Sequence, residues 1–393
     1  MDSLYILHSP RVILFPLREI IQVSAVNSLF TRFTAFDTSN ASSREAGAEY
    51  KPDVTIYETE KGSPTRTTSV QTMEMFVEFK HGNSSDPFSP NVDFSYKLFE
   101  AASATRDQII FYSARQRAHQ FRTSTFTVGI FGEVARLIRW DNTGFRVTVP
   151  IDYSKKRGNR QLVEFFLRLD QMADDREARG WDQTVRDATP EEVVAFSEAV
   201  EVACKPQWSR PCRKKMDPLF CRLIKSVGDP SKYLRRKVSI LEGSAKRDYI
   251  VGRPTSFSKA PAGRTTRGFV AMSVQTKKLV FLKDSWRLDA DDLLPEDHWY
   301  KALEKCEGIN MKNIGAYLHG SDVYATRKFV RCQDKKQRTI THFYTKDLGR
   351  AEAMMGYIHH RVVLSELYLP LEMFKDSKHL TNVMYDVAKG AFL

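Results

Sequence analysis

The chain has 393 residues, of which 42% are hydrophobic, and a formal net charge of +12 at pH 7. This length and apolar fraction are sufficient for two folded domains with separate cores, and they exclude a chain that is disordered throughout. No apolar run is long enough to span a bilayer, and the amino terminus lacks the pattern of a secretory signal. We therefore expect an intracellular protein, in the cytoplasm or the nucleus, with no membrane partner. The five cysteines are scattered without a C-x-x-C pair, so neither a disulfide framework nor a zinc site is predicted.

The first candidate site lies on two predicted strands. Asp53 stands at the start of a short strand pattern, and a second pattern at residues 73–79 ends in Glu78, Phe79 and Lys80. Side chains alternate along a strand, so Glu78 and Lys80 share one face. Two carboxylates can hold Mg²⁺ through oxygen, and a lysine can orient or activate the attacking water. Asp53 and Glu78 are therefore candidate metal ligands and Lys80 a candidate catalytic residue. In the alternative interpretation, Asp53 caps a turn and Glu78 forms a surface ion pair with Lys80.

The order of these residues resembles the restriction-endonuclease-like fold, usually written PD-(D/E)-x-K. Gln108 and Tyr112, in the next predicted helix, are similar to the Q-x-x-x-Y element of its exonuclease branches. Strands predicted at 125–131, 134–140 and 145–149, the last two joined by a turn at 141–144, suit an α/β/α core. The resemblance implies a metal-dependent nuclease that uses Asp53, Glu78, Lys80, Gln108 and Tyr112.

The middle of the chain is predicted to be helical and then strongly basic. Leu162, Phe166 and Leu169 form an apolar stripe at helical spacing, and Pro190 opens another helix. Residues 205–247 contain thirteen lysines and arginines but three acids. Such a segment can bind nucleic acid through phosphate contacts, with the run 235–237 as the first candidate, and that binding would weaken steeply with salt. The alternative is a solvated connector between domains.

A second candidate site begins at Gly263. Residues 269–274 and 278–285 alternate as two strands, and Lys283 lies on the second of them. Gly263 and Gly268 allow the backbone to lie close over a phosphate, and the ammonium group of Lys283 can then contact the phosphate oxygens. The alternative is a plain surface hairpin with a solvated lysine.

The spacing of this segment resembles the glycine loop G-x-G-x-x-G-x-V of protein kinases, with Thr265 at the middle glycine and Val270 at the end. Lys283 closes the sequence V-F-L-K, where kinases carry V-A-I-K. Together with the following D-S-W-R, this segment is similar to the fungal-type protein kinase family. The resemblance implies ATP bound by Gly263, Thr265, Gly268, Val270 and Lys283. It also implies that Glu296, or Glu304 as a fallback, pairs with the lysine from a helix predicted at 295–306.

Two features reduce the activity that this resemblance implies. The motifs H-R-D and D-F-G, which supply the catalytic base and the metal ligands of kinases, do not occur in the 393 residues. Phe281 stands where V-A-I-K has a small alanine, so its ring can fill the adenine pocket. We expect a truncated, kinase-like protein with weak ATP binding and no phosphate transfer of its own.

The sequence thus predicts a chain of mixed α/β and α+β class in three parts. A nuclease-like α/β/α domain covers 1–160, a helical and basic connector covers 161–246, and residues 247–393 form a kinase-like lobe. That lobe is a five-stranded antiparallel sheet with one helix, followed by a helix at 377–391 that begins a second lobe. The first functional hypothesis is the truncated fungal-type kinase-like protein. The alternatives are a metal-dependent nuclease and a non-catalytic scaffold for nucleic acid or protein.

Overall fold

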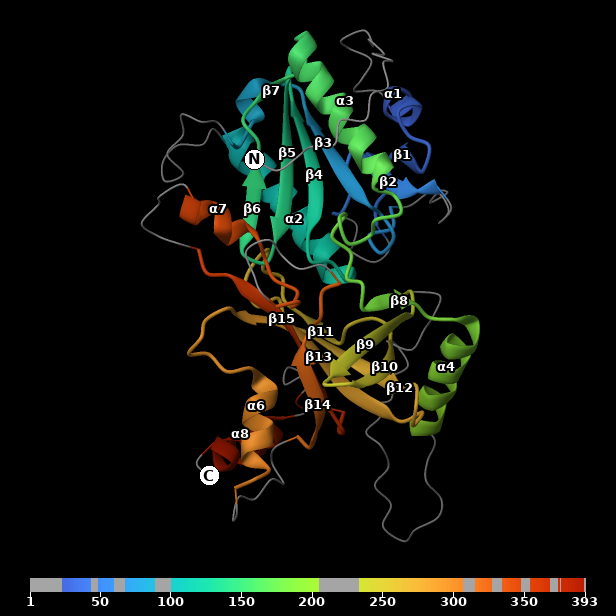
Figure 1. Cartoon of the computed structure of the whole chain (residues 1–393), viewed down its shortest axis with the longest axis vertical. Coiled ribbons are helices and arrows are strands. Elements are labelled where there is room, and N and C mark those ends of the chain that lie inside the picture. Colours follow the sequence, from blue (N-terminus) through green and yellow to red (C-terminus); the bar gives the residue numbers. More distant parts are fainter. Residues whose placement is uncertain are drawn as a thin grey trace.

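The computed structural model describes residues 23–43, 49–59, 68–88, 100–204, 233–306, 315–326, 334–347, 354–367, 374 and 376–391. These residues form two β-sheets, one in each half of the chain, which lie one above the other in Figure 1. The predicted mixed α+β class is therefore confirmed. Among the described residues, none of the helices combines the length and the apolar composition that a membrane crossing requires.

The first sheet has the strand order β1-β2-β3-β4-β5-β6, and β7 pairs with β5. Its strands are β1 (Phe33–Asp37), β2 (Val54–Glu58), β3 (Met75–Lys80), β4 (Thr125–Phe131), β5 (Val134–Asp141), β6 (Gly144–Val147) and β7 (Ile151–Asp152). All neighbours are antiparallel except β3 and β4, which are parallel. A parallel pair needs a crossover connection, and α2 (Glu100–His119) lies in that connection, after a 3-10 turn η2 (Asn83–Ser85).

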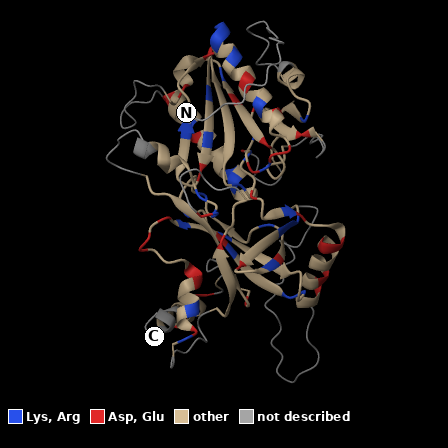
Figure 2. Ribbon diagram, in the orientation of Figure 1, with Lys and Arg blue, Asp and Glu red and all other residues tan. Residues whose placement is uncertain are grey.

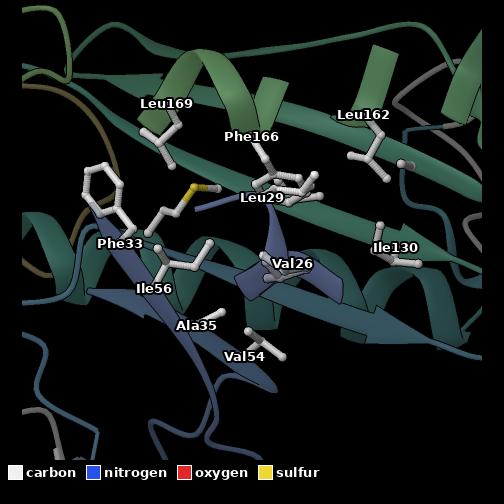
Figure 3. Close-up of a cluster of buried hydrophobic side chains, with 14 of the residues drawn as sticks. Val26, Leu29, Phe33, Ala35, Val54, Ile56, Ile130, Leu162, Phe166 and Leu169 are labelled. Carbon is white, nitrogen blue, oxygen red and sulfur yellow. The ribbon is translucent and has the colours of Figure 1, made fainter. Parts of the chain in front are cut away.

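Helices cover both faces of the first sheet. On one face, α1 (Val23–Ser28) and α3 (Lys156–Gln171) enclose the largest apolar cluster, in which Leu162, Phe166 and Leu169 of α3 meet Ile56 and Ile130 (Figure 3). On the other face, α2 packs through its buried residues against the side chains that point away from α3. Because both faces are covered, β4 is buried almost throughout rather than at alternate residues.

The second sheet has the order β14-β15-β13-β12-β10-β9-β8, with β11 beside β12, and all its pairs are antiparallel. Its strands are β8 (Val185–Asp187), β9 (Arg236–Glu242), β10 (Ala245–Val251), β11 (Ser256–Phe257), β12 (Arg267–Ser273), β13 (Leu279–Leu288), β14 (Tyr317–Asp322) and β15 (Tyr357–Leu364). The helices of this half are α4 (Pro190–Cys204), α6 (Glu296–Leu303), α7 (Thr341–Asp347) and α8 (Ser377–Ala391).

The expected connector at 161–246 is divided between the two halves. Helix α3 packs on the first sheet. By contrast, β8 and β9 are strands of the second sheet, and α4 packs against that sheet. Most of the basic segment, residues 205–232, lies outside the described residues. Its described end contradicts the expectation of a free basic surface at 235–237: Arg235 and Lys237 are buried, Arg236 pairs with Asp187, and Lys237 pairs with Glu192. These side chains are buried or paired with acids because β9 is an inner strand of the sheet, with neighbours on both sides.

Buried charged groups join the two halves. Arg361 of β15 donates from Nη2 to Asp182, 2.5 Å away, and from Nε to Asp284, 2.9 Å away. Asp182 lies in the segment that follows α3, so this contact connects the end of the first half to the second sheet. Figure 2 shows that basic and acidic residues both occur where the halves meet. The aromatic ring of Phe121, after α2, stacks on Phe269 within the core of the second sheet.

Candidate functional site

Strands β2 and β3, which precede α2, bring Asp53, Glu78 and Lys80 together. Strands β2 and β3 pair with Val54 opposite Val77, so the next step of the register places Asp53 beside Glu78. The backbone N–H of Phe79 donates to Oδ2 of Asp53 at 2.8 Å, which holds the Asp53 carboxylate against β3. Lys80 Nζ donates to Oε1 of Glu78 at 2.6 Å. The three predicted residues therefore form one cluster.

Glu78 is the unusual member of this cluster because its carboxylate is inside the protein. Its side chain is 0% exposed, whereas that of Lys80 is 27% exposed and reaches solvent. The pKa of Glu78 is raised to about 7, first by burial and then by the nearby charge of Asp53, against the opposing effect of Lys80. Its second oxygen, Oε2, is buried and has no hydrogen-bond partner among the described residues. A buried oxygen without a hydrogen-bond partner lowers the stability of the folded protein unless a water molecule or a ligand binds to it.

Gln108 and Tyr112 of α2 lie against the same corner of the sheet. Gln108 Nε2 donates to the hydroxyl of Tyr112 at 3.0 Å, and that hydroxyl donates to the carbonyl of Lys51 at 3.1 Å. The pKa of Tyr112 is raised, first by burial, and the negative charges of Glu78 and Asp53 contribute. The pair therefore holds the backbone just before Asp53, and all five residues predicted for the nuclease-like site are neighbours.

Asp53 and Glu78 are the residues of this cluster that could hold one hard cation. Among the described residues, no group of three or more His, Cys, Asp or Glu side chains is arranged to hold a metal ion. Asp53 and Glu78 are a pair, which is below that number. Mg²⁺ commonly uses one or two carboxylates and takes its other ligands from water and substrate phosphates. The unpartnered Oε2 of Glu78 beside the Asp53 carboxylate therefore fits a divalent cation.

In the second sheet, the structure brings Lys283 and Glu296 together. Lys283 Nζ lies 2.8 Å from Oε1 and 2.6 Å from Oε2 of Glu296, the first residue of α6. The two side chains are 27% and 26% exposed. Glu304, the fallback partner, caps the far end of α6 and is exposed. The lysine thus has the helix partner that the kinase resemblance implied.

The predicted phosphate loop takes a different position from the one expected. The backbone N–H of Gly263 donates to the carbonyl of Asn142 at 2.7 Å, and Nδ2 of Asn142 donates to Oγ1 of Thr265 at 2.5 Å. Asn142 lies in the turn between β5 and β6, so the start of the loop is docked on the first half of the protein. Gly268 is already inside β12, directly opposite Lys283. We expected residues 263–268 to form an open loop above Lys283, and in the structure they do not.

Apolar side chains cover the face of the second sheet next to Lys283. Cross-strand partners point to the same face, and Val270 pairs with Phe281 as Gly268 pairs with Lys283. Val270 is buried against Phe196 of α4. The ring of Phe281 occupies the space over Gly268, since a Cβ added there would be 2.8 Å from the ring. Apolar side chains thus fill the position expected for an adenine.

Sequence reasoning missed Asn142, which organises the loop at 263–265. The turn at 141–144 was recognised only as a turn, because nothing in its local pattern indicates a partner more than one hundred residues away. No family model matches the chain, and neither the curated proteins nor the solved structures contain a match. The nuclease and kinase resemblances therefore rest on the residues and geometry described above.

Proposed function

We propose that the chain is a divalent-metal-dependent phosphodiesterase that cleaves nucleic acid at Asp53, Glu78 and Lys80. The observation that carries this proposal is the buried Glu78 carboxylate, which has a free oxygen and lies next to a second carboxylate and a lysine. A buried acid without a full set of partners is unfavourable for stability, and such groups are frequent at functional sites.

Each residue has a role that follows from its contacts. Asp53 and Glu78 would hold the cation, with the Asp53 carboxylate oriented by the backbone of β3. A bound Mg²⁺ polarises the phosphate and lowers the pKa of a water ligand. Lys80, which reaches from Glu78 to solvent, would orient the attacking water or stabilise negative charge on the phosphate. Gln108 and Tyr112 hold the backbone at Lys51 and so position the segment that carries Asp53.

A cleavage assay tests the proposal. Purified protein with Mg²⁺ or Mn²⁺ is expected to cleave single- or double-stranded DNA, and Asp53→Asn, Glu78→Gln and Lys80→Ala are each expected to remove the activity. Asp107→Asn is the matched control, since Asp107 adjoins Gln108 in α2 but its side chain is 68% exposed. Cleavage that survives all three site variants would contradict the assignment.

Metal binding supplies a readout independent of cleavage. Calorimetric titration with Mn²⁺ is expected to show one site in the wild-type protein and none in Glu78→Gln. Because protons compete with the cation for Glu78, the affinity should rise between pH 6 and pH 8. Equal Mn²⁺ binding by Glu78→Gln would place the metal elsewhere.

For the second sheet we propose a kinase-like lobe without phosphate transfer. The supporting observation is the Lys283–Glu296 pair, in which the lysine lies on β13, an inner strand of an antiparallel sheet that has eight strands rather than the five expected. The covering of Val270 by α4 and of Gly268 by Phe281 argues against an open nucleotide site. In buffer that already contains Mg²⁺, added ATP is therefore expected to leave the melting temperature unchanged. A rise in melting temperature that Lys283→Ala abolishes would contradict this proposal and leave the nuclease proposal unaffected.

A further inference from the structure

A small cavity lies where the two halves of the protein meet. Helix α2 forms one wall, and the segment 258–267, between β11 and the start of β12, forms the other. The volume is about 20 Å³, which exceeds the ~10–15 Å³ that one water molecule requires. Two exposed residues, Ala260 and Pro261, lie on its wall.

The charged residues that line the cavity are all basic. Its lining contains Arg117, Arg122 and Arg267, and no aspartate or glutamate of the described residues. Two of the arginines have a carboxylate partner outside the cavity: Arg122 pairs with Glu74 at 2.9 Å, and Arg267 with Asp284 at 3.1 Å. Their charges are largely compensated.

Arg117 differs from the other two arginines. Its Nη1 donates to the carbonyl oxygens of Asp141 and Pro261, at 3.0 and 2.7 Å, and it forms no ion pair with any described residue. Its Nε is buried without a hydrogen-bond partner. The pKa of Arg117 is lowered to about 10, first by burial and then by the charges of Arg267 and Arg139, against the opposing charge of Asp141. The side chain as a whole is half-buried, but a buried N–H without a partner is unfavourable unless an anion or water completes its contacts.

Two hydroxyl groups add further donors. The oxygen of Thr265 accepts from Asn142 at 2.5 Å, and that of Ser258 accepts from the N–H of Ala260 at 3.1 Å. Each hydroxyl therefore keeps its hydrogen to donate. Thr265 has a φ of +35°, which is uncommon for a β-branched residue. Strained backbone of this kind persists where surrounding contacts enforce it, often at ligand sites.

We propose that this cavity binds one small inorganic anion of chloride size, held chiefly by Arg117. The anion would accept from Arg117 Nε and from the free hydroxyl hydrogens, and it would supply the negative charge that the wall lacks. Because α2 belongs to the first half and residues 258–267 to the second, the bound anion stabilises the junction between the halves. The site is separate from the proposed metal cluster and does not depend on it.

Thermal unfolding in different salts tests the proposal. At equal ionic strength, the melting temperature of the wild-type protein is expected to be higher in sodium chloride than in sodium gluconate, and the increase should saturate with chloride concentration. Arg117→Met keeps the apolar stem of the side chain but removes the donor, so the chloride dependence should disappear. Arg106→Met in the same helix is the matched control and should retain it, since Arg106 pairs with Asp107 on the exposed surface.

A second measurement covers the case in which Arg117→Met does not fold. Crystals of the wild-type protein grown in sodium bromide should show an anomalous peak within hydrogen-bond distance of Arg117 Nε. No peak there, or equal melting temperatures in chloride and gluconate, would overturn the proposal. Stabilisation by inorganic phosphate without any by chloride would overturn the assignment of a monatomic anion.

Discussion

Replacing Glu78 by glutamine should stabilise the metal-free protein at alkaline pH. The pKa of Glu78 is raised from 4.5 to about 7 in the folded protein, so folding favours the protonated form. Its contribution to stability is therefore complete below pH 4.5 and is lost as the pH rises through 7. Glutamine has a similar shape and no charge. The variant therefore keeps at alkaline pH the stability that the wild type has only when Glu78 is protonated.

The size of the effect follows from the pKa. A rise from 4.5 to about 7 corresponds to about 3 kcal/mol, at about 1.4 kcal/mol per pKa unit. Because the side chain is fully buried, solvent does not screen this energy. At pH 8 without metal, Glu78→Gln is expected to unfold with a free energy up to about 3 kcal/mol above that of the wild type. At pH 4.5 the two proteins should be nearly equal, since Glu78 is then neutral in both states.

Urea unfolding at several values between pH 4.5 and pH 8, in the presence of EDTA, measures this difference. Glu74→Gln is the matched control: Glu74 is also buried, but Arg122 and Arg179 both pair with it. Removing that charge leaves the buried Arg122 without its carboxylate partner, whereas Arg179 keeps its pair with Glu58, and it should cost about 3–5 kcal/mol at pH 8. The two glutamates of one chain segment are therefore expected to give effects of opposite sign.

The pH profile decides whether the reasoning holds. A Glu78→Gln variant that is less stable than the wild type at pH 8, or a difference that does not change with pH, would refute the argument from burial. Adding Mg²⁺ at pH 8 should stabilise the wild type and not the variant, which would remove the advantage of glutamine.

Three further substitutions test other parts of the fold by urea unfolding. Arg361→Met leaves two buried carboxylates without their shared cation and should cost about 3–5 kcal/mol; wild-type stability would mean that the junction between the halves does not depend on this pair. Lys283→Met breaks a partly exposed pair with Glu296 and should cost less than about 1 kcal/mol, and a larger loss would give the pair a structural role. Gly180→Ala should destabilise by more than about 1 kcal/mol, because φ is +85° and the new Cβ would lie 2.2 Å from the carbonyl oxygen of Ser124; an unchanged midpoint would show that the backbone relaxes there.

Local patterns predicted most elements well. The strand expected at 125–131 is β4 over the same residues, and the helix expected at 377–391 is α8. The helix expected at 295–306 is α6, which is shorter at both ends. These predictions succeeded because the spacing of apolar residues reports directly whether a segment buries alternate residues or one helical stripe.

The candidate metal cluster was predictable in part. The two-residue spacing of Glu78 and Lys80 places them on one face of any strand, and an antiparallel neighbour can then bring Asp53 beside Glu78. The sequence could not show that Glu78 would be fully buried or that its pKa would rise, because burial depends on α2 and on neighbouring strands. In the sequence, two acids and a lysine on a solvent-exposed surface have the same pattern as two acids and a lysine in a metal site.

The sequence by itself determined many of the helices and strands, the apolar faces of several of them, and the residues able to bind a cation or a phosphate. Only the tertiary structure decided what covers each face. Pro190 predicts the start of α4, but not that Phe196 would pack on Val270 where an adenine was expected. Likewise, the glycines at 263–268 permit a close backbone approach, but the hydrogen bonds from Asn142 direct that approach to the first half of the protein. The physical reason is that the conformation of a segment depends on its own residues, whereas its partners are selected by contacts between segments far apart in the chain.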